Sequence, residues 1–240
     1  MASLTIGDPV AIMSRKDIKL RVRLIAEETA ETIRALTSPE WNEEAKLGTL
    51  DGLCDLVYVS AGTAVSRGPW GYNTGRTLKF EGGDNAFHEW RQIVREKDDT
   101  LKRVRLAEYL AKESRTLCRI VRSFGIMPDV SSAMEINDSV NALNDLCFGV
   151  ACVLKLPFDA GFMEVQNANM SKRLKSGAVF HDKGGKLRKP PGFVGPDLKY
   201  ALKHGKPKKR KPFTVPTMNG TRMSDLDLLA YVKQQDWKIV

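Results

Sequence analysis

Histidine and cysteine are scarce in this chain of 240 residues, which contains three histidines and four cysteines. The histidines are far apart in sequence, and no cysteines have the spacing of zinc ligands, so neither a zinc site nor a histidine-based catalytic group is indicated. The cysteines lie in apolar stretches of helical pattern and are predicted to be reduced core residues. They are Cys54, Cys118, Cys147 and Cys152.

Long apolar runs without charge are also missing, because no run reaches the ~18 residues that a membrane-spanning helix needs. Residues 1–9 lack the basic-then-apolar pattern of a signal peptide. The hydrophobic content of 42% and the charged content of 28% are ordinary for a soluble protein with a core. We therefore expect a cytoplasmic protein without membrane contact, with room for one large domain or two small ones.

Acidic residues, in contrast, gather at two places, and the first is an amphipathic segment. Over residues 16–36, apolar residues recur at steps of three and four, which predicts a helix. Glu27 and Glu31 continue one of its leucine lines, and Glu28 lies one step round from Glu31. The three carboxylates share one sector, either as a solvated face beside the core face or as ligands that converge on one or two ions.

A second helix is predicted for about residues 45–65, where apolar side chains cover the whole circumference, as in a buried helix. Past Lys46, its only charges are Asp51 and Asp55, which lie four residues apart and so on one face. Asp51 has an alternative explanation as the N-cap of a helix that starts later. Asp55 lies within the run, where an unpaired carboxylate is costly. We therefore expect a metal or a buried cation at Asp55.

The kind of ligand indicates the kind of metal. Carboxylates without histidine or cysteine partners favour Mg²⁺ or Mn²⁺ over Zn²⁺. Mg²⁺ in proteins usually binds substrate phosphates and retains several waters. One such water, activated by the metal and a nearby carboxylate, could act as the nucleophile. The acidic segments therefore predict phosphate chemistry.

Glu-Glu-x-x-Glu at residues 27–31, followed by a second acidic helix, resembles the all-α nucleoside triphosphate pyrophosphohydrolases. That superfamily includes MazG, dimeric dUTPase and phosphoribosyl-ATP pyrophosphohydrolase. Residues 51–64 (Asp-Gly-Leu-Cys-Asp-Leu-Val-Tyr-Val-Ser-Ala-Gly-Thr-Ala) look like the MazG-like form often found in phages. Residues 164–172 end in a stretch similar to that subgroup's Asn-Met-Ser-Lys motif, and residues 182–198 resemble its usual ending. The resemblance covers roughly residues 8–68 and 158–198.

The resemblance implies an all-α antiparallel helical bundle and Mg²⁺-dependent cleavage between the α- and β-phosphates, which gives a nucleoside monophosphate and pyrophosphate. It implies four metal ligands, namely Glu28, Glu31, Asp51 and Asp55. Glu27 and Asp51 would take part either as ligands or as the base that activates water. The family's second motif is usually Glu-x-x-Asp, whereas this chain has Gly52 at the glutamate position. Asp51 is the nearest acid to that position.

The Asn-Met-Ser-Lys segment adds two implied contacts with the substrate. Asn169 and Lys172 would bind the phosphates or the nucleoside. Without the resemblance, Lys172 is an ordinary exposed lysine at a helix end. Phage relatives would use the activity to reshape the deoxynucleotide pool in the host cytoplasm, with a purine deoxynucleotide such as dGTP as the first candidate and dUTP or dCTP as alternatives. The family commonly pairs its subunits, so a homo-oligomer is expected.

Two alternatives remain at this point. The first is phosphoribosyl-ATP pyrophosphohydrolase activity, against which the long insertion and the basic tail speak weakly. The second is a non-catalytic nucleic-acid-binding protein that keeps the fold, supported by Gly52 and by the basic run at 203–211. Such a run is more often a solvated loop, and it lacks the interleaved aromatic residues that stack on bases.

The domain organisation follows from these segments. The pyrophosphohydrolase domain is predicted over residues 1–175, with an insertion or degenerate repeat at about 69–156, and a basic extension is predicted over 176–240. The extension is expected to be largely irregular. Residues 178–180 and 186–188 flank Asp-Lys-Gly-Gly, which is typical of a β-hairpin turn.

The insertion contains echoes of the acidic helices. Two segments recur, residues 21–24 as 103–106 and residues 55–58 as 145–148, with the paired landmarks 34 and 42 residues apart. Most of the acids have no counterpart, since Tyr109 and Leu110 stand for Glu27 and Glu28, and Asn141 for Asp51. One interpretation is an internally duplicated pseudo-dimer with one active centre, and the other is chance similarity between amphipathic helices.

Overall fold

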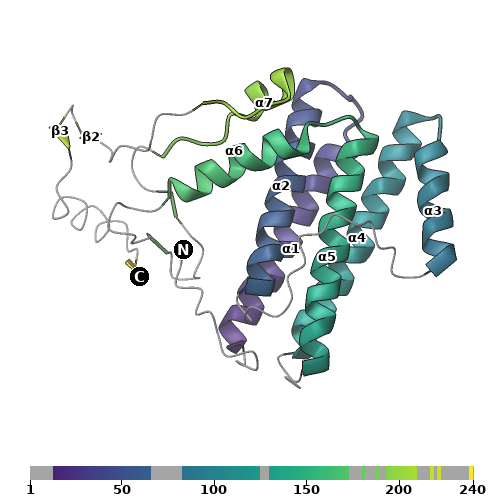
Figure 1. Cartoon of the computed structure of the whole chain (residues 1–240), viewed down its shortest axis with the longest axis horizontal. Helices are drawn as coiled ribbons and strands as arrows, with labels where there is room; N and C mark the ends of the chain where they lie inside the picture. The colour runs from purple at the N-terminus through teal and green to yellow at the C-terminus, as the bar shows by residue number, and fades with distance from the viewer. Residues whose placement is uncertain are drawn as a thin grey trace. The chain divides into compact units, whose positions relative to one another are not determined.

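Seven α-helices account for most of the residues that the computed structural model describes, as expected for an all-α protein (Figure 1). The described residues are 13–65, 83–124, 130–172, 180–181, 188–189, 193–209, 217–218, 221–222 and 238–239. The helices are α1 (Arg15–Leu36), α2 (Glu43–Val65), α3 (Gly83–Arg95), α4 (Asp99–Phe124), α5 (Val130–Val153), α6 (Phe158–Met170) and α7 (Leu198–His204). In these ranges no helix combines the length and apolar character needed to cross a membrane.

The chain divides into two compact units, called here the N-terminal unit (Thr5–Asp159) and the C-terminal unit (from Ala160 onward). The division falls in the first turn of α6, whereas the sequence suggested a boundary after residue 175. The reason lies in Glu164 of α6, whose carboxylate accepts hydrogen bonds from backbone amides on both sides of α7. These bonds attach α6 to the segment that follows it.

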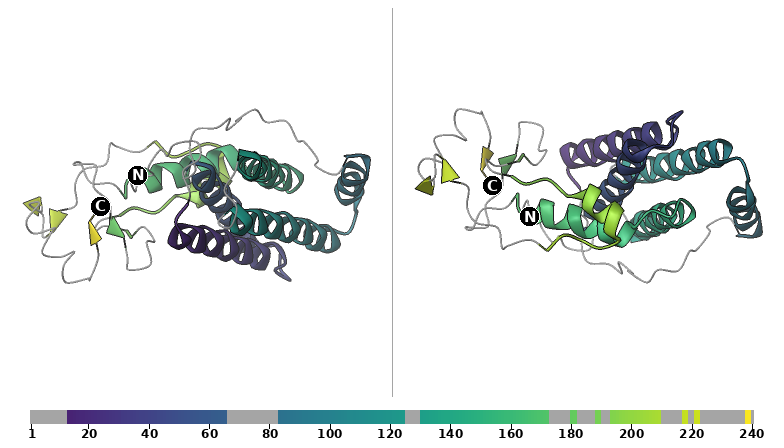
Figure 2. Two further views of the ribbon diagram at one scale, coloured as in Figure 1. Left: turned by 90° about the horizontal axis from the view of Figure 1, so that it is seen from below. Right: turned by 90° about the horizontal axis from the view of Figure 1, so that it is seen from above.

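The N-terminal unit is built around two helical hairpins, α1–α2 and α4–α5. Helix α1 packs against α2 and α4, and α5 packs against α2 and α4, so the four helices form a closed ring (Figure 2). Helix α3 lies against α4, where the rings of Trp90 and Tyr109 have centroids 6.4 Å apart. Each helix of the ring therefore packs against two others in the ring, and α4 packs against α3 as well.

Helix α1 has the predicted bounds to within one residue, and its cap explains where it starts. The Ser14 side chain accepts a hydrogen bond from the Asp17 amide, which satisfies one of the free N–H groups of the first turn. Its buried residues recur at helical spacing: Ile18, Val22, Ile25, Thr29, Thr32 and Leu36. The two buried threonine hydroxyls donate to the carbonyls of Ile25 and Glu28, each at 2.6 Å, so their burial leaves neither hydroxyl unbonded.

Helix α2 starts earlier than Asp51, which removes the N-cap explanation for that residue. Asn42 provides the cap, since its side-chain oxygen accepts a hydrogen bond of 3.0 Å from the Ala45 amide. Asp51 therefore lies two turns inside the helix. On the core side of α2, the Ser60 hydroxyl donates to the side-chain oxygen of Asn144 in α5 at 2.6 Å. This polar contact joins the two hairpins.

Three of the four cysteines lie in the core as predicted, and none of the four is in a disulfide. Cys152 is the exception, because it is exposed. The helical turn explains this correction: Val150 and Ala151 face the core, which directs the next residue of α5 outward. Burial raises the pKa of the Cys147 thiol well above its ordinary value. Such a thiol is kept neutral and unreactive.

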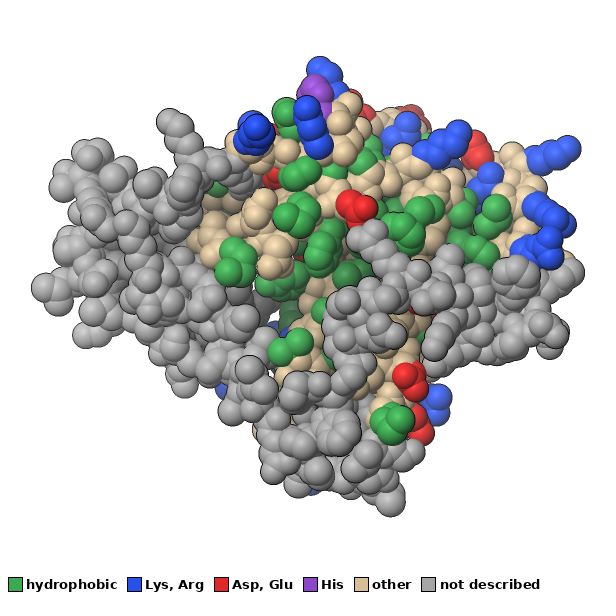
Figure 3. Space-filling model, viewed as in Figure 1, with side chains coloured by type: hydrophobic (Ala, Val, Ile, Leu, Met, Phe, Trp, Pro, Cys, Tyr) green, Lys and Arg blue, Asp and Glu red, His purple; other side chains and the backbone are tan. Residues whose placement is uncertain are grey.

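In the C-terminal unit, short strands accompany α6 and α7. Strand β1 (Phe180–His181) pairs antiparallel with β4 (Lys238–Ile239), and β2 (Thr217–Met218) with β3 (Thr221–Arg222). The predicted hairpin of 178–180 with 186–188 lies largely outside the described residues, and within them Phe180 lies opposite Ile239. A turn signal cannot show which distant strand competes for an edge. Figure 3 shows lysine side chains and a histidine gathered over α7 at the top of the view.

Candidate active site

A cleft of about 480 Å³ lies between α1 and α2 in the N-terminal unit. Residues of α1, of the connecting turn and of α2 line it. Five of the lining residues are carboxylates: Glu28, Glu31, Glu44, Asp51 and Asp55. All four metal ligands implied by the family resemblance are therefore found at one cleft, and Glu44 adds a fifth acid that the sequence did not single out.

Two glycines allow the helices that carry these acids to approach closely. A Cβ atom at Gly52 would lie 2.4 Å from Oγ1 and 2.9 Å from Cα of Thr32, so α1 leaves no room for a side chain there. A Cβ at Gly48 would lie 3.1 Å from Cβ of Ala35. The two glycines are one turn apart on α2 and alternate with Asp51 and Asp55. Close contact between backbones thus sets the width of the cleft.

The same contact accounts for the departure from the Glu-x-x-Asp motif. Any side chain at position 52 would clash with the backbone of Thr32, which cannot yield as a flexible side-chain end can. In this structure a ligand at that position is sterically excluded. The adjacent Asp51, which lines the cleft, is the acid available near it.

The acids are less buried than their apolar sequence surroundings suggested. Glu28, Asp51 and Asp55 are half-buried, and Glu31 is exposed. Their side chains border the cleft, while residues beside them such as Ile25 and Leu53 are fully buried in the core. The cost of desolvating the carboxylates is correspondingly smaller than for a buried ion. The cost of burial alone therefore does not require a cation. The evidence for a cation site is that several negative charges meet at one cleft.

That convergence affects neighbouring groups. Burial, reinforced by the negative charges of Asp55 and Asp51, raises the pKa of the Cys54 thiol well above its ordinary value. Burial together with the Asp55 carboxylate also raises the pKa of the Tyr58 hydroxyl. Both shifts penalise a further negative charge beside Asp55. The shifts show that the negative charges of Asp51 and Asp55 are felt by the groups beside them.

The donor atoms suit a hard cation. Carboxylate oxygens and the Asn42 amide line the cleft, and among its described lining residues there is neither histidine nor cysteine. In the described part of the chain, no three histidine, cysteine, aspartate or glutamate side chains are already grouped to hold one ion. Mg²⁺ commonly binds through one or two carboxylates and completes its octahedron with waters and substrate phosphates. The residues therefore fit Mg²⁺ or Mn²⁺ by donor type, with substrate or water as further ligands.

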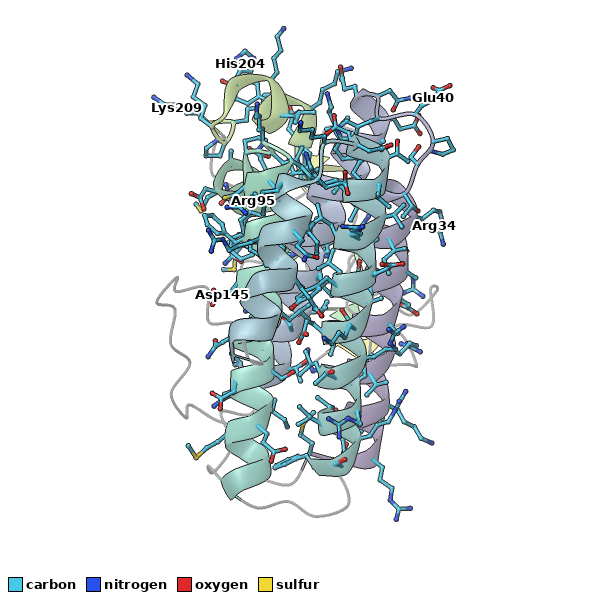
Figure 4. The ribbon with its side chains drawn as sticks, turned by 90° about the vertical axis from the view of Figure 1, so that its right-hand side faces the viewer. Arg34, Glu40, Arg95, Asp145, His204 and Lys209 are labelled. Carbon is cyan, nitrogen blue, oxygen red and sulfur yellow. The ribbon has the colours of Figure 1, made fainter. Side chains whose placement is uncertain are left out.

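Several lining residues were not anticipated from the sequence, among them Arg34, Ser38, Asn42 and Glu44. Arg34 is an exposed cation at the side of the bundle (Figure 4). Asn42 followed by two glutamates is a signature of a helix start, so the cap was recognisable. That the same asparagine also borders a cleft depends on the hairpin geometry, for which the sequence has no local signal.

Glu27 stands apart from the other acids, because it is not among the residues that line the cleft. Its carboxylate lies 3.6 Å from the guanidinium of Arg23, with the two side chains 40% and 47% exposed. An exposed ion pair of this kind contributes little to stability. The assignment of Glu27 as the base remains a prediction from the family resemblance.

Asn169 and Lys172 belong to the C-terminal unit, where the structure brings them together. The Lys172 ammonium donates a hydrogen bond of 2.5 Å to the side-chain oxygen of Asn169 at the end of α6. This hydrogen bond lies within that unit. Comparisons with known protein families, with curated proteins and with solved structures find no match to this chain.

Proposed function

We propose that this protein is a Mg²⁺-dependent nucleoside triphosphate pyrophosphohydrolase of the MazG-like type, able to use Mn²⁺ as well. The observation that carries the proposal is the convergence of carboxylates from two facing helices on one cleft. The motif resemblance supplies the reaction, and the donor chemistry supplies the ion. The product would be a nucleoside monophosphate, which alters the nucleotide pool of the cytoplasm.

In the proposed reaction, the oxygen of a water molecule forms a bond to the α-phosphorus. The bond between this phosphorus and the oxygen that bridges to the β-phosphate breaks, and pyrophosphate leaves with that electron pair. Asp51 or Glu27 takes the proton of the attacking water and later releases it to solvent. Bound Mg²⁺ supplies neutralisation of the triphosphate and activation of the water. Glu28, Glu31 and Asp55 would hold the ion and, through it, the phosphates.

The Asn-Met-Ser-Lys segment has a separate role in the proposal. Lys172 contacts a phosphate, and Asn169 holds the lysine in position through the hydrogen bond between them. A purine deoxynucleotide such as dGTP is the proposed substrate, with dUTP and dCTP as the next candidates. The roles of both residues in this proposal come from the motif resemblance.

The direct test is a panel of ribo- and deoxynucleoside triphosphates with Mg²⁺, Mn²⁺ or EDTA, scored for pyrophosphate and monophosphate. Asp55→Asn should lower pyrophosphate release at least ~100-fold, because a cleft ligand is lost while the volume is kept. Asp145→Asn is the matched control, since Asp145 lies on α5 and not at the cleft. Full activity of Asp55→Asn, or equal losses in the two variants, would refute the proposal.

A second candidate function rests on charge. From Ala160 onward the chain has 17 lysines and arginines against six aspartates and glutamates, a net charge of +11. Such a unit could bind nucleic acid without turnover. Salt-sensitive retention of DNA, with no pyrophosphate from any nucleotide, would favour this candidate. Phosphoribosyl-ATP belongs in the panel as the third possibility, since it requires the same phosphate chemistry.

We also infer that the hairpins α1–α2 and α4–α5 arose by duplication, so that one chain resembles a pair of subunits. The recurring segments fall on corresponding helices, Arg21 on α1 with Arg103 on α4, and Asp55 on α2 with Asp145 on α5. Superposition of the two hairpins with these residues aligned tests the inference. Pairing of whole chains, common in the family, is proposed as well and is measurable by light scattering.

A further inference from the structure

The C-terminal unit contains an aromatic ring that two lysines approach. The ammonium of Lys172 lies 5.6 Å and that of Lys189 lies 5.3 Å from the centroid of the Phe193 ring. Both distances are within the ~6 Å range in which a cation is attracted to the ring. The lysines come from segments 17 residues apart. These three residues are called here the Lys–Phe–Lys cluster.

One member of the cluster is fixed by the end of α6. The Lys172 backbone amide bonds to the Asn169 carbonyl at 3.1 Å, and its ammonium bonds to the Asn169 side-chain oxygen. The Ser171 hydroxyl donates to the carbonyl of Ala168 at 2.7 Å, which closes the same turn. Because the Asn169 oxygen accepts from the lysine, the NH₂ end of that amide is left as a donor beside the ammonium.

Charge in this unit favours an anion. Among its described residues the acids are Glu164 and Asp197, and hydrogen bonds engage both carboxylates. Glu164 accepts from the backbone amides of Asp197 and Lys208, and Asp197 accepts from the Tyr200 amide and the Lys208 ammonium. These bonds fasten the segment around α7. Both ammonium groups lie within ~6 Å of the same ring centroid, so one extended polyanion could reach the two charges together.

We propose that the Lys–Phe–Lys cluster binds the phosphate groups of a polyphosphate anion, with Lys189 and Phe193 as previously unassigned parts of the site. Ammonium groups act as point charges toward phosphate oxygens, and the Asn169 amide adds a neutral donor. Phe193 attracts each ammonium group through its ring and contacts no phosphate itself. The identity of the anion as a nucleoside triphosphate rests on the proposed function, whereas the site itself does not.

The test measures binding of inorganic tripolyphosphate to the full chain by calorimetry, in EDTA so that no divalent ion contributes. Lys189→Gln should weaken binding about tenfold, the loss expected for one charge-assisted contact. Phe193→Leu should weaken it by a smaller factor, because leucine keeps the apolar contact and loses the ring. Lys203→Gln removes the same charge from an exposed residue of α7 and should change affinity less than about twofold.

Equal weakening by Lys189→Gln and Lys203→Gln would show that general positive charge binds the anion, which would overturn the proposal. Unchanged binding in both Lys189→Gln and Phe193→Leu would overturn it as well. Thermal melting of each variant checks that it folds, and Lys189→Arg, which keeps the charge at this exposed position, should retain binding. Repeating the titration in Asp55→Asn separates the two proposals, since the cluster should bind tripolyphosphate there even if turnover is lost or never occurs.

Discussion

The two hairpins of the N-terminal unit pack against each other in the helical ring. They differ in the kind of residues found between their two helices. Between α1 and α2, glycines and carboxylates face each other and leave a cleft. In α4, Leu110 stands where the proposed repeat would place Glu28, and it is fully buried. Four packed helices can thus enclose either a site or more core. A cleft forms where a few positions carry small and acidic residues, and core forms where they carry large apolar ones.

The α4–α5 hairpin does retain isolated acids. Figure 4 shows Asp145 on the α5 side of the bundle, away from Arg34, which lines the cleft. The neighbouring Asn144 turns inward and accepts the hydrogen bond of Ser60. We therefore expect the α1–α2 hairpin to carry the function and the α4–α5 hairpin to have structural roles.

The largest effect should come from the acids that face each other. Asp51→Asn should lower pyrophosphate release at least ~100-fold if this residue is a ligand or the base. Asn141→Ala and Glu113→Gln, in the α4–α5 hairpin, should leave the rate unchanged. Glu27→Gln should have an intermediate effect at most, given its contact with Arg23. Steady-state rates with melting curves as the folding control measure this series, and a normal rate in Asp51→Asn contradicts the ligand assignment.

The next largest effect should be on stability, through Arg103. Its buried guanidinium donates to the carbonyls of Leu36 at 2.9 Å and Ser38 at 2.7 Å and lies 4.9 Å from the Trp41 ring. Arg103→Met should cost about 2–4 kcal/mol, because two carbonyls lose their donor. Arg105→Met on the same helix removes only a partly exposed pair with Glu96 and should cost less than about 1 kcal/mol. Urea denaturation compares the two, and equal losses would contradict the proposed role.

Gly52→Ala should test whether backbone contact sets the width of the cleft. The added methyl meets Thr32 at 2.4 Å, so the helices must separate, at a cost of about 1–3 kcal/mol and with reduced turnover. In Gly48→Ala the added methyl lies 3.1 Å from Cβ of Ala35. The cost of this close contact is offset by a helix-propensity gain of about 1 kcal/mol. Denaturation midpoints and rates distinguish the variants. A stabilised and fully active Gly52→Ala protein would disprove the close approach.

The smallest effect is expected where the hairpins share a polar contact. Ser60→Ala should destabilise by about 1 kcal/mol, the usual net value of one buried hydrogen bond. A double-mutant cycle with Asn144→Ala should give a coupling energy of similar size, since the two side chains are directly bonded at 2.6 Å. Additive losses would show that the contact carries no specific energy.

The local features of the fold followed from the sequence. Spacing of apolar residues located α1 and α2, because burying one side of a helix imposes that period whatever the partner is. The shared face of Asp51 and Asp55 followed for the same reason. Cys152 was misplaced because an apolar run indicates burial of a helix and not which residues at its end face outward.

Features that depend on a second segment did not follow. Gly52 looked like a defect in a motif, and only the position of Thr32 on the facing helix shows why no side chain fits. In the sequence, Arg103 is one of two arginines in a recurring segment. Nothing in that segment indicates its contacts with the turn after α1. The pairing of Phe180 with Ile239 was likewise hidden, since strand pairing is a choice among distant partners.

Arg103 has a consequence for how the cleft forms during folding. Every residue of the cleft belongs to the first third of the chain, yet its rim at Ser38 is held by a guanidinium that follows Leu36 by 67 residues. Helices α1 and α2 can form from local contacts, whereas this rim requires closure of a long loop. The rim therefore becomes ordered only when α4 docks. A fragment ending at residue 65 would contain every acid and still lack a finished cleft.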